Sequence, residues 1–383
     1  MELIMYINKH RVIETVSSFL PYSANWLYEL FNIQLDKPLF IAEYREQKDN
    51  FKYDNLIYLK EKGNKDIRLI TELKYYYLLN RKFHNENIII HSHFGPKGYF
   101  DYLFFKKWNK KSKHIVSFYG YDLSTLLTQE KWRNRYLNLS KEIDLFLVLG
   151  KSMKNKLLKI GIAEEKIKIF HLGVDLTKMP RVIRSINQEK TVKFITVGRF
   201  TEKKAIPLTI EAFKRYLKFN PNAQLIIVGE SDGSLEQENE KAKILKEITP
   251  DIEEKVIFKG ILNYERLINT MGESDILLHP SVTSKDGDEE GTPLVIINAM
   301  ALGIPVISTL HSDIPEIITD GYSGKLVEEG NLSRLIDAMI MLSSDSKLYT
   351  KISESSRIVI ENQFNLKKQS AALVNIYEEI TKP

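Results

Sequence analysis

The organisation of this chain is clearest in the stretch from residue 285 to residue 309. It reads Lys285-Asp286-Gly287-Asp288-Glu289-Glu290-Gly291-Thr292-Pro293-Leu294-Val295-Ile296-Ile297-Asn298-Ala299-Met300-Ala301-Leu302-Gly303-Ile304-Pro305-Val306-Ile307-Ser308-Thr309. An acidic loop that contains glycine leads into a helix-forming run and then into a strand-forming run. Thr292 is the predicted N-cap and Pro293 the first helical residue, because proline has no N–H to lose there. Gly303 is expected to end the helix in a left-handed conformation, and Pro305 prevents its continuation.

The start of this helix predicts a site for an anion. The first backbone N–H groups of a helix are free, and the helix carries a partial positive charge at this end, so a phosphate is favoured there. Glu290 stands at the mouth of the loop, where a carboxylate can accept hydrogen bonds from sugar hydroxyls. The stretch therefore predicts a phosphate beside a sugar.

Two segments of this stretch resemble the signature of the retaining glycosyltransferases of family 4, which have the GT-B fold. They are Glu290-Gly291-Thr292-Pro293 and Ala299-Met300-Ala301-Leu302-Gly303-Ile304-Pro305-Val306. The flanking segments most resemble the colanic-acid and amylovoran exopolysaccharide branch, and they are Pro280-Ser281-Val282-Thr283 and His311-Ser312-Asp313-Ile314-Pro315-Glu316. The resemblance is strong over about residues 192–330 and patchy before them. Seven residues after its first Glu the family has a second one, and here Asn298 takes that place.

Length and composition predict two soluble domains. A chain of 383 residues is too long for one ordinary core, and its 43% hydrophobic and 27% charged residues are typical of globular proteins. The resemblance implies an α/β protein of two doubly wound, Rossmann-like domains that face each other across a cleft. We expect an acceptor-binding domain at residues 1–180, a nucleotide-sugar-binding domain at 181–365, and a helix at 366–383 that crosses back to the first domain.

The absence of cysteine excludes disulfides and thiolate metal sites. We find no signal-peptide pattern at the N-terminus and no apolar run of the ~20 residues that a membrane span needs. A cytoplasmic protein is therefore expected, with the inner face of the membrane as a possible place of action.

The two halves differ in charge. Residues 1–180 hold 30 Lys and Arg against 20 Asp and Glu, whereas the remaining residues carry a net negative charge. The densest basic run is Lys106 to Lys113, which fits either a solvated helix end or a surface for anionic lipid headgroups. No nucleic-acid-binding motif accompanies the charge, so nucleic acid is not expected as a partner.

Strands that end in polar residues recur through the first half. Phe40–Tyr44 and Asn55–Leu59 are predicted strands, and Asp66–Phe83 is a predicted helix. Ile88–Gly95, His114–Asp122 and Asp144–Leu149 are apolar runs that finish in polar residues or glycine. Repeated units of strand, polar tip and helix predict a doubly wound domain, whose ligands bind at the carboxyl ends of its strands.

Those tips place His93, Tyr119 and Asp122 in the expected cleft. Each of them fits a structural role as well as a functional one. In the family the position of Tyr119 is a His that contacts the donor sugar near the reacting centre. A phenol has a pKa near 10 and cannot shuttle protons as imidazole does. The first strands carry weaker candidates, Glu14 and Thr15, since the Gly-Gly pair of many relatives is absent there.

Three histidines, His91, His93 and His114, lie on neighbouring predicted strands. No set of carboxylates accompanies them at a spacing that would complete a metal site. No Asp-x-Asp motif of the kind that binds a metal and a diphosphate occurs in a suitable loop. We therefore expect a metal-independent protein without a cofactor.

The second half begins with the strand Val192–Val197, after an aperiodic segment from Pro180 to Lys190 that reads as a linker. This strand leads to Arg199 and Lys204. When a sugar is transferred from a nucleotide-diphosphate donor, the nucleotide diphosphate departs as an anion. Without a metal, Arg199 and Lys204 must stabilise the charge of this leaving group. The matching residues of the family bind the donor diphosphate.

The resemblance also implies a set of donor-binding positions. Its members are Gly198, Gly229, Ile261, Leu262, Gly291, Thr292, Pro293, Leu294 and Asn298. The backbone at Ile261 and Leu262 is expected to pack on the nucleotide base. Asn298 stands where the family has a Glu that accepts hydrogen bonds from the ribose hydroxyls. Loss of this charged acceptor is expected to weaken the free energy of donor binding by roughly 1.5–3 kcal/mol, or about ten- to a hundredfold in donor affinity.

The sequence thus predicts transfer of a hexose from a UDP- or GDP-sugar to a saccharide or a lipid-linked saccharide, with retention of anomeric configuration, in surface polysaccharide or glycoconjugate synthesis. Glu290, Arg199, Lys204 and Tyr119 are the expected catalytic residues. Two alternatives stay open. One is a catalytically silent partner that binds saccharide or a sister transferase, and the other is a sugar-nucleotide epimerase. The donor sugar, the acceptor and the linkage stay open as well.

Overall fold

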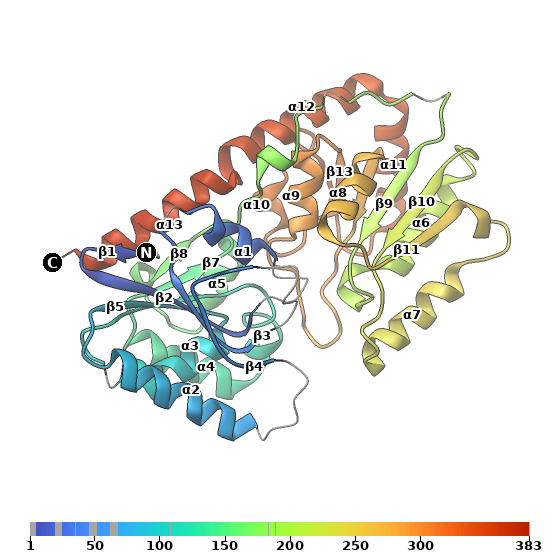
Figure 1. The fold of residues 1–383 in the computed structure, drawn as a ribbon. Coiled ribbons are helices and arrows are strands. Elements are labelled where there is room, and N and C mark those ends of the chain that lie inside the picture. Colours follow the sequence, from blue (N-terminus) through green and yellow to red (C-terminus); the bar gives the residue numbers. More distant parts are fainter. Residues whose placement is uncertain are drawn as a thin grey trace. The chain divides into compact units, whose positions relative to one another are not determined.

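The computed structural model describes residues 5–19, 25–34, 36–45, 52–61, 68–107, 109–182, 184–187 and 189–382 (Figure 1). The chain divides into two compact units. Unit 1 is Met1–Asp175 together with Leu366–Pro383, and unit 2 is Leu176–Asn365. The chain passes from unit 1 to unit 2 between Asp175 and Leu176. In the described residues no helix combines the length and the apolar character that crossing a bilayer requires.

Unit 1 is built on an eight-stranded sheet of order β4-β3-β2-β5-β6-β7-β8, in which β1 is paired antiparallel to β2 and the other pairs are parallel. The strands are β1 (Tyr6–Ile7), β2 (His10–Phe19), β3 (Leu39–Arg45), β4 (Leu56–Glu61), β5 (Ile88–His93), β6 (Lys113–Ser117), β7 (Leu145–Val148) and β8 (Ile167–Ile169). The helices are α1 (Asn25–Asn32), α2 (Arg68–Phe83), α3 (Gly95–Asp101), α4 (Glu130–Ser140), α5 (Lys151–Lys159) and α13 (Leu366–Thr381).

The polar residues of unit 1 sort onto two faces because side chains alternate along a strand. Figure 1 shows α2, α3 and α4 on one face of the sheet and α1 and α13 on the other. Glu14 pairs with His91 across β2 and β5, and both side chains meet Tyr377 of α13. Thr15 and Ser92 point the other way, and both donate to Asp101 at the end of α3.

Unit 2 is a six-stranded parallel sheet of order β11-β10-β9-β12-β13-β14. The strands are β9 (Lys193–Val197), β10 (Gln224–Val228), β11 (Val256–Gly260), β12 (Ile276–His279), β13 (Val306–Thr309) and β14 (Lys325–Val327). The helices are α6 (Ile206–Tyr216), α7 (Leu235–Glu247), α8 (Tyr264–Gly272), α9 (Leu294–Ala301), α10 (Ile314–Ile317), α11 (Leu332–Ser344) and α12 (Ser346–Gln363).

The core of unit 2 joins the sheet to its helices. Phe194 and Leu225 on the sheet pack with Phe213 and Tyr216 of α6 and with Leu335 of α11, and all five are fully buried. The central strands β9, β10 and β12 are mostly apolar and buried, which is typical of parallel strands covered on both faces.

The strands predicted at Phe40–Tyr44 and Asn55–Leu59 and the helix predicted at Asp66–Phe83 are present as β3, β4 and α2, with ends shifted by at most two residues. The apolar runs that begin at residues 88, 114 and 144 contain β5, β6 and β7. Asp66 and Ile67 of the predicted helix lie outside the described residues. The segment predicted as a linker contains neither helix nor strand where it is described, but it is not free. Arg184 donates to the carbonyl oxygens of Gly272, Ser274 and Leu302 at 2.9–3.1 Å, which fixes the segment to unit 2.

The helix predicted after the acidic loop is present as α9, but it begins one residue later than predicted. Its first residue is Leu294, and Pro293 occupies the N-cap with extended backbone angles and no capping side chain. The proline side chain has no oxygen that could accept a backbone N–H of the first helical turn. Thr292 has one, but it lies one position before the N-cap. The predicted end is confirmed. Gly303 has φ of 70°, and its N–H donates to Met300 while that of Ile304 donates to Ala299, as in a Schellman motif.

Candidate active site

The carboxyl ends of β9 and β10 approach each other more closely than side chains would permit. Gly229 has φ of 141°, and a Cβ atom there would lie 1.8 Å from the carbonyl oxygen of Gly198. A Cβ atom on Gly198 would in turn meet the aliphatic part of Lys204 at 3.0–3.1 Å. The two glycines therefore let the backbone and the Lys204 side chain share one small space.

Lys204 and Glu290 form an ion pair in that space, with 2.7 Å between Nζ and Oε1 and with 14% and 9% of the side chains exposed. Lys204 ends a 3-10 turn (Glu202–Lys204), after which Ala205 adopts a left-handed conformation and α6 begins. Burial lowers the pKa of Lys204, and Glu290 opposes this shift. Burial would raise the pKa of Glu290, but Lys204 and then Lys203 hold that pKa well below its usual range. The carboxylate is thus kept ionised inside the protein.

The neighbouring lysine fixes the acidic loop. Lys203 Nζ lies 2.7 Å from Asp288 Oδ2 and donates to the carbonyl oxygen of Glu289 at 3.2 Å. Arg199, by contrast, is exposed, although its charge helps lower the pKa of Lys204 after the larger effect of burial. The structure thus brings Lys204 and Glu290 together directly and places the Arg199 charge near them.

The loop that carries Glu290 is held by two residues that the sequence argument had not assigned to the site. His311 follows β13, and its Nε2 accepts the backbone N–H of Glu290 at 3.0 Å. Glu329 accepts from His311 Nδ1 at 2.6 Å with one oxygen and from the backbone N–H of Thr283 at 2.8 Å with the other. A loop without helix or strand depends on such anchors. The signal that could have found His311 was its place just after a parallel strand.

Replacing His311 by alanine is expected to destabilise unit 2 by about 1–3 kcal/mol, because a buried N–H would lose its acceptor. We expect a fall in kcat as well, since Glu290 would no longer be held in one place. Glutamine at this position still offers an oxygen to the Glu290 N–H and should retain more stability and activity. Thermal unfolding and steady-state sugar transfer measure the two effects. Equal losses for the alanine and glutamine variants would contradict this role.

His279 is a further buried side chain of this region that the sequence argument left out. It ends β12 and is 1% exposed. Burial, with Lys204 next, lowers its pKa to about 3, so the imidazole is neutral at physiological pH. It adds no charge beside Lys204 and Glu290.

The other predicted donor-binding residues lie around this ion pair and farther along the same sheet edge. Gly291, Thr292 and Pro293 are buried, and Leu294 is half-buried at the start of α9. Ile261 is 69% exposed just after β11, and Leu262 beside it is half-buried. Asn298 is 5% exposed, and its Oδ1 accepts from the Tyr264 hydroxyl at 3.3 Å. The single acceptor oxygen of Asn298 is therefore already shared with the protein.

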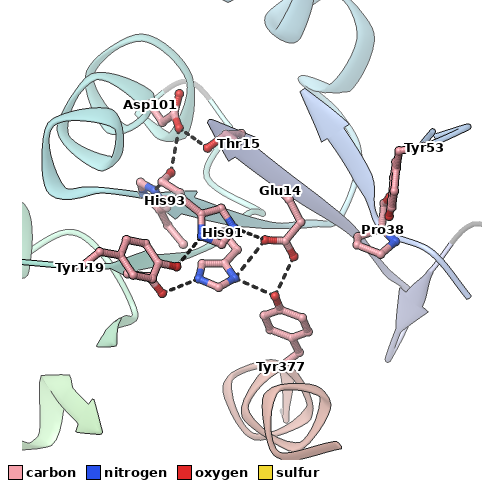
Figure 2. Close-up of polar contacts among 12 residues, drawn as sticks. Glu14, Thr15, Pro38, Tyr53, His91, His93, Asp101, Tyr119 and Tyr377 are labelled. Atoms are coloured by element: carbon pink, nitrogen blue, oxygen red, sulfur yellow. Dashed lines mark hydrogen bonds and ion pairs between the residues drawn. The ribbon is translucent and has the colours of Figure 1, made fainter. Parts of the chain in front are cut away.

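In unit 1 the prediction that the three histidines have no carboxylate partner was wrong. A carboxylate does join His91 and His93: Glu14 Oε2 lies 3.0 Å from His91 Nδ1 and 2.9 Å from His93 Nε2 (Figure 2). The three groups have ligand atoms within 4.8 Å of one another, as a metal site requires. The partner was missed because Glu14 lies 77 residues before His91 and becomes its neighbour only through the parallel pairing of β2 and β5. His114 belongs to the other face, where its Nε2 lies 2.8 Å from Ser92 Oγ.

Hydrogen bonds inside the protein account for this group. Tyr377 donates to Glu14 Oε1 at 2.7 Å, and Ser117 Oγ lies 2.7 Å from His91 Nε2. Burial would raise the pKa of Glu14, but His91 and His93 lower it to about 2. A carboxylate between two imidazoles and a phenol is thus a self-sufficient polar network, and α13 is tied to the sheet through it.

Of the three residues predicted at the strand tips of unit 1, only Tyr119 reaches the surface. It is half-buried, whereas His93 and Asp122 are fully buried. The oxygens of Asp122 accept the backbone N–H groups of Gly95, Tyr119 and Gly120, each at 3.0 Å. Asp122 therefore holds together the loops that follow β5 and β6.

The opposite face of the unit 1 sheet holds a second buried ionic group. Lys97 lies 3.1 Å from both Glu43 Oε1 and Asp101 Oδ1 and 3.7 Å from the centre of the Tyr75 ring. Thr15, the second weak candidate of the first strands, donates to Asp101 at 2.5 Å. All of these side chains are buried, so the group binds β2, β3 and α3 to one another.

Comparisons with known proteins now bear on this geometry. Residues 181–359 match the model of the family described as "Glycosyl transferases group 1". The chain is 29% identical over 270 residues, 70% of its length, to the amylovoran biosynthesis glycosyltransferase AmsK of Erwinia amylovora. It is 28% identical over 291 residues, 76% of its length, to the putative colanic acid biosynthesis glycosyltransferase WcaL of Escherichia coli. The chain spans about two thirds of the length of these relatives, 65% and 70%.

Among solved structures, HepE of Anabaena in complex with UDP and glucose superposes with a TM-score of 0.78 at 14% identity, over 96% of this chain and 99% of that one. Two parallel α/β units and this likeness define the class as a GT-B protein, as the sequence predicted. Residues 181–359 thus resemble the glycosyl transferases group 1 family. The predicted resemblance to the amylovoran and colanic-acid glycosyltransferases is confirmed.

Proposed function

We propose that this protein transfers a hexose from a nucleotide-diphosphate sugar, UDP- or GDP-linked, to a saccharide or lipid-linked saccharide, with retention at the anomeric carbon. The observation that carries the proposal is the buried Lys204–Glu290 pair ahead of the first residue of α9. A cation and an anion held side by side can serve the two halves of such a donor, which are a diphosphate and a polyhydroxylated ring.

The proposed role of the pair changes when the donor binds. The diphosphate competes with Glu290 for Lys204, and the exposed Arg199 adds a bidentate contact. Glu290 then accepts hydrogen bonds from sugar hydroxyls and orients the reacting carbon. Protein cations meet the charge of the leaving group in this scheme, without a metal or a cofactor.

Donor binding is proposed to be weaker than a second Glu at position 298 would give. The Asn298 oxygen accepts a hydrogen bond from Tyr264, so a ribose hydroxyl must compete for it. The missing ribose contact weakens donor binding but is remote from the bond that is broken, so we expect sugar transfer to be retained.

The relatives' names place them in amylovoran and colanic acid biosynthesis, and we propose a surface polysaccharide or glycoconjugate as the product here. An acceptor carried by a lipid would bring the protein to the inner face of the membrane. In the basic run from Lys106 to Lys113, Lys106 donates to the carbonyl oxygen of Ser112, and Lys113 pairs with Asp144 at 3.3 Å. Lys107, Lys110 and Lys111 are exposed and are the residues we propose for contact with anionic headgroups.

Calorimetric titration with a panel of UDP- and GDP-sugars tests the proposal. We expect heat from at least one donor, and with that donor transfer to a saccharide acceptor. No heat from any donor with a folded sample would refute it. Binding without turnover would favour the silent partner, and turnover of UDP-N-acetylglucosamine without acceptor would favour the epimerase.

A further inference from the structure

The last residue of β12 is a buried histidine whose Nε2 has no hydrogen-bond partner among the described residues. His279 is 1% exposed, and its carbonyl oxygen accepts from Ser308 Oγ at 2.6 Å and from the backbone N–H of Ser281 at 2.9 Å. The backbone that carries the ring is therefore fixed on both sides. A buried polar atom without a partner is costly, so the unpaired nitrogen calls for a physical reason.

Strand order places this ring between the loops of the candidate active site. β12 lies between β9 and β13 in the sheet. The register of β12 with β9 puts His279 beside the end of β9, from which the chain runs on to Lys204. On the other side β13 leads to His311, which holds the loop of Glu290. His279 is thus the strand-end residue between the two halves of the Lys204–Glu290 pair.

Electrostatic effects identify the groups around the ring. Burial lowers the pKa of His279 most, and the charged or titratable groups that act on it next are Lys204, Glu290, His311 and Lys203. The influence is mutual. Burial would raise the pKa of Glu290, whereas Lys204, Lys203 and then His279 lower it. A neutral imidazole therefore lies within electrostatic reach of both members of the ion pair.

The Glu290 carboxylate can accept a further hydrogen bond. Its Oε1 lies 2.7 Å from Lys204 Nζ and has no other hydrogen-bond donor in the part of the chain that the structure describes. In the proposed function the diphosphate competes with Glu290 for Lys204. A carboxylate that is only 9% exposed would then lose its cation, and the cost of leaving that charge unpaired would oppose donor binding.

We propose that His279 is a positioning residue that donates a hydrogen bond from Nε2 to the Glu290 carboxylate when the diphosphate engages Lys204. Two buried atoms that lack hydrogen-bond partners then satisfy each other. A hydrogen bond from a neutral ring keeps the carboxylate ionised, and it brings no second cation that would compete for the diphosphate. The inference rests on the proposed function, which supplies the diphosphate.

A double-mutant cycle in nucleotide binding tests this role. His279→Leu should weaken the binding of UDP or GDP, whichever binds the wild type, about ten- to a hundredfold, the value of a hydrogen bond to a charged group. In a Glu290→Gln background the same substitution should weaken binding less than about threefold, because no buried charge is left unpaired. Losses of equal size in the two backgrounds would mean a merely structural role and would refute the proposal.

Two further variants sharpen the cycle. His279→Gln should keep most of the affinity, because the glutamine amide nitrogen can take the place of Nε2 as a donor. His114→Leu is the matched control. That ring is also fully buried, lies in unit 1, has a pKa that burial lowers to about 3, and has a nitrogen without a partner among the described residues. It should bind nucleotide like the wild type, and a loss equal to that of His279→Leu would contradict the proposal.

The binding data separate this inference from the proposed function. Equal binding by the wild type and His279→Leu refutes the role of His279 alone. If neither UDP nor GDP binds the folded wild type, the proposed function fails and the role of His279 fails with it.

The wild-type protein also offers a test without a change in the site. Nitrogen-15 NMR of the histidine rings, with His279→Gln used for assignment, should show a proton on His279 Nε2 at saturating nucleotide. The signal of this proton should shift as nucleotide is added, because it gains the Glu290 oxygen as an acceptor. An Nε2 without a proton in the nucleotide complex would overturn the proposal.

Discussion

Lys204→Met is expected to destabilise unit 2 by about 3–5 kcal/mol and to lower transfer by about a hundred- to a thousandfold. The stability falls because Glu290, whose side chain is only 9% exposed, would lose the partner 2.7 Å away and remain a buried charge. The activity falls because, in the proposed function, Lys204 is the buried cation that stabilises the departing diphosphate. Chemical denaturation and steady-state transfer measure the two quantities.

A double variant separates the two effects. Lys204→Met with Glu290→Gln removes both charges, so we expect most of the stability to return while transfer stays low. Lys285→Met is the matched control, because that lysine belongs to the same loop region and its side chain is 88% exposed. If Lys204→Met bound nucleoside diphosphate like the wild type, the phosphate-binding role would be wrong.

Stability is expected to fall steeply as the pH decreases from 6.5 towards 4. Burial lowers the pKa of His93 to about 4 and the pKa values of His114 and His279 to about 3. In the unfolded chain these rings titrate near 6.5, so the unfolded state binds more protons than the folded state throughout this range. Each ring therefore lowers the free energy of unfolding by about 1.4 kcal/mol for each pH unit of decrease. This stability is fully present above pH 6.5 and is lost as the pH falls towards the folded pKa values.

The two units should respond differently. His93 and His114 lie in unit 1 and His279 in unit 2, so the slopes should be about 3 and about 1.4 kcal/mol per pH unit. Denaturation followed at several pH values measures them. His114→Asn should remove about one proton from the uptake of unit 1 and leave unit 2 unchanged. A stability that does not change between pH 6.5 and 5 would contradict the neutral, buried state of these rings.

Much of the fold could be predicted because its signals are local. Apolar runs that end in glycine or polar residues marked the strands of both sheets, and Gly303 marked the end of α9. The error at the start of α9 has a local cause too. Thr292 and Pro293 suit the N-cap and the first helical position, and this local chemistry did not reveal that the helix begins one residue later, at Leu294. The Lys204–Glu290 site was predicted because each residue belongs to a recognisable loop after a strand.

The networks behind the site could not be predicted in this way. Glu14 and His93 are 79 residues apart, and Glu290 and His311 are 21 apart. In neither case does the spacing match the period of one helix or one strand. Their partners depend on strand order, because parallel pairing aligns positions that no local pattern relates.

The sequence by itself determined the class of fold, the strand-loop-helix units and the residue types at the carboxyl edges of the sheets. These follow from periodicity and from turn chemistry, which act over a few residues. Only the tertiary structure decided which carboxylate meets which histidine, and that Asp122 holds two backbone loops together from the interior. Those outcomes depend on burial and on distances below about 3 Å between segments far apart in the chain, and such distances exist only once the sheets have formed.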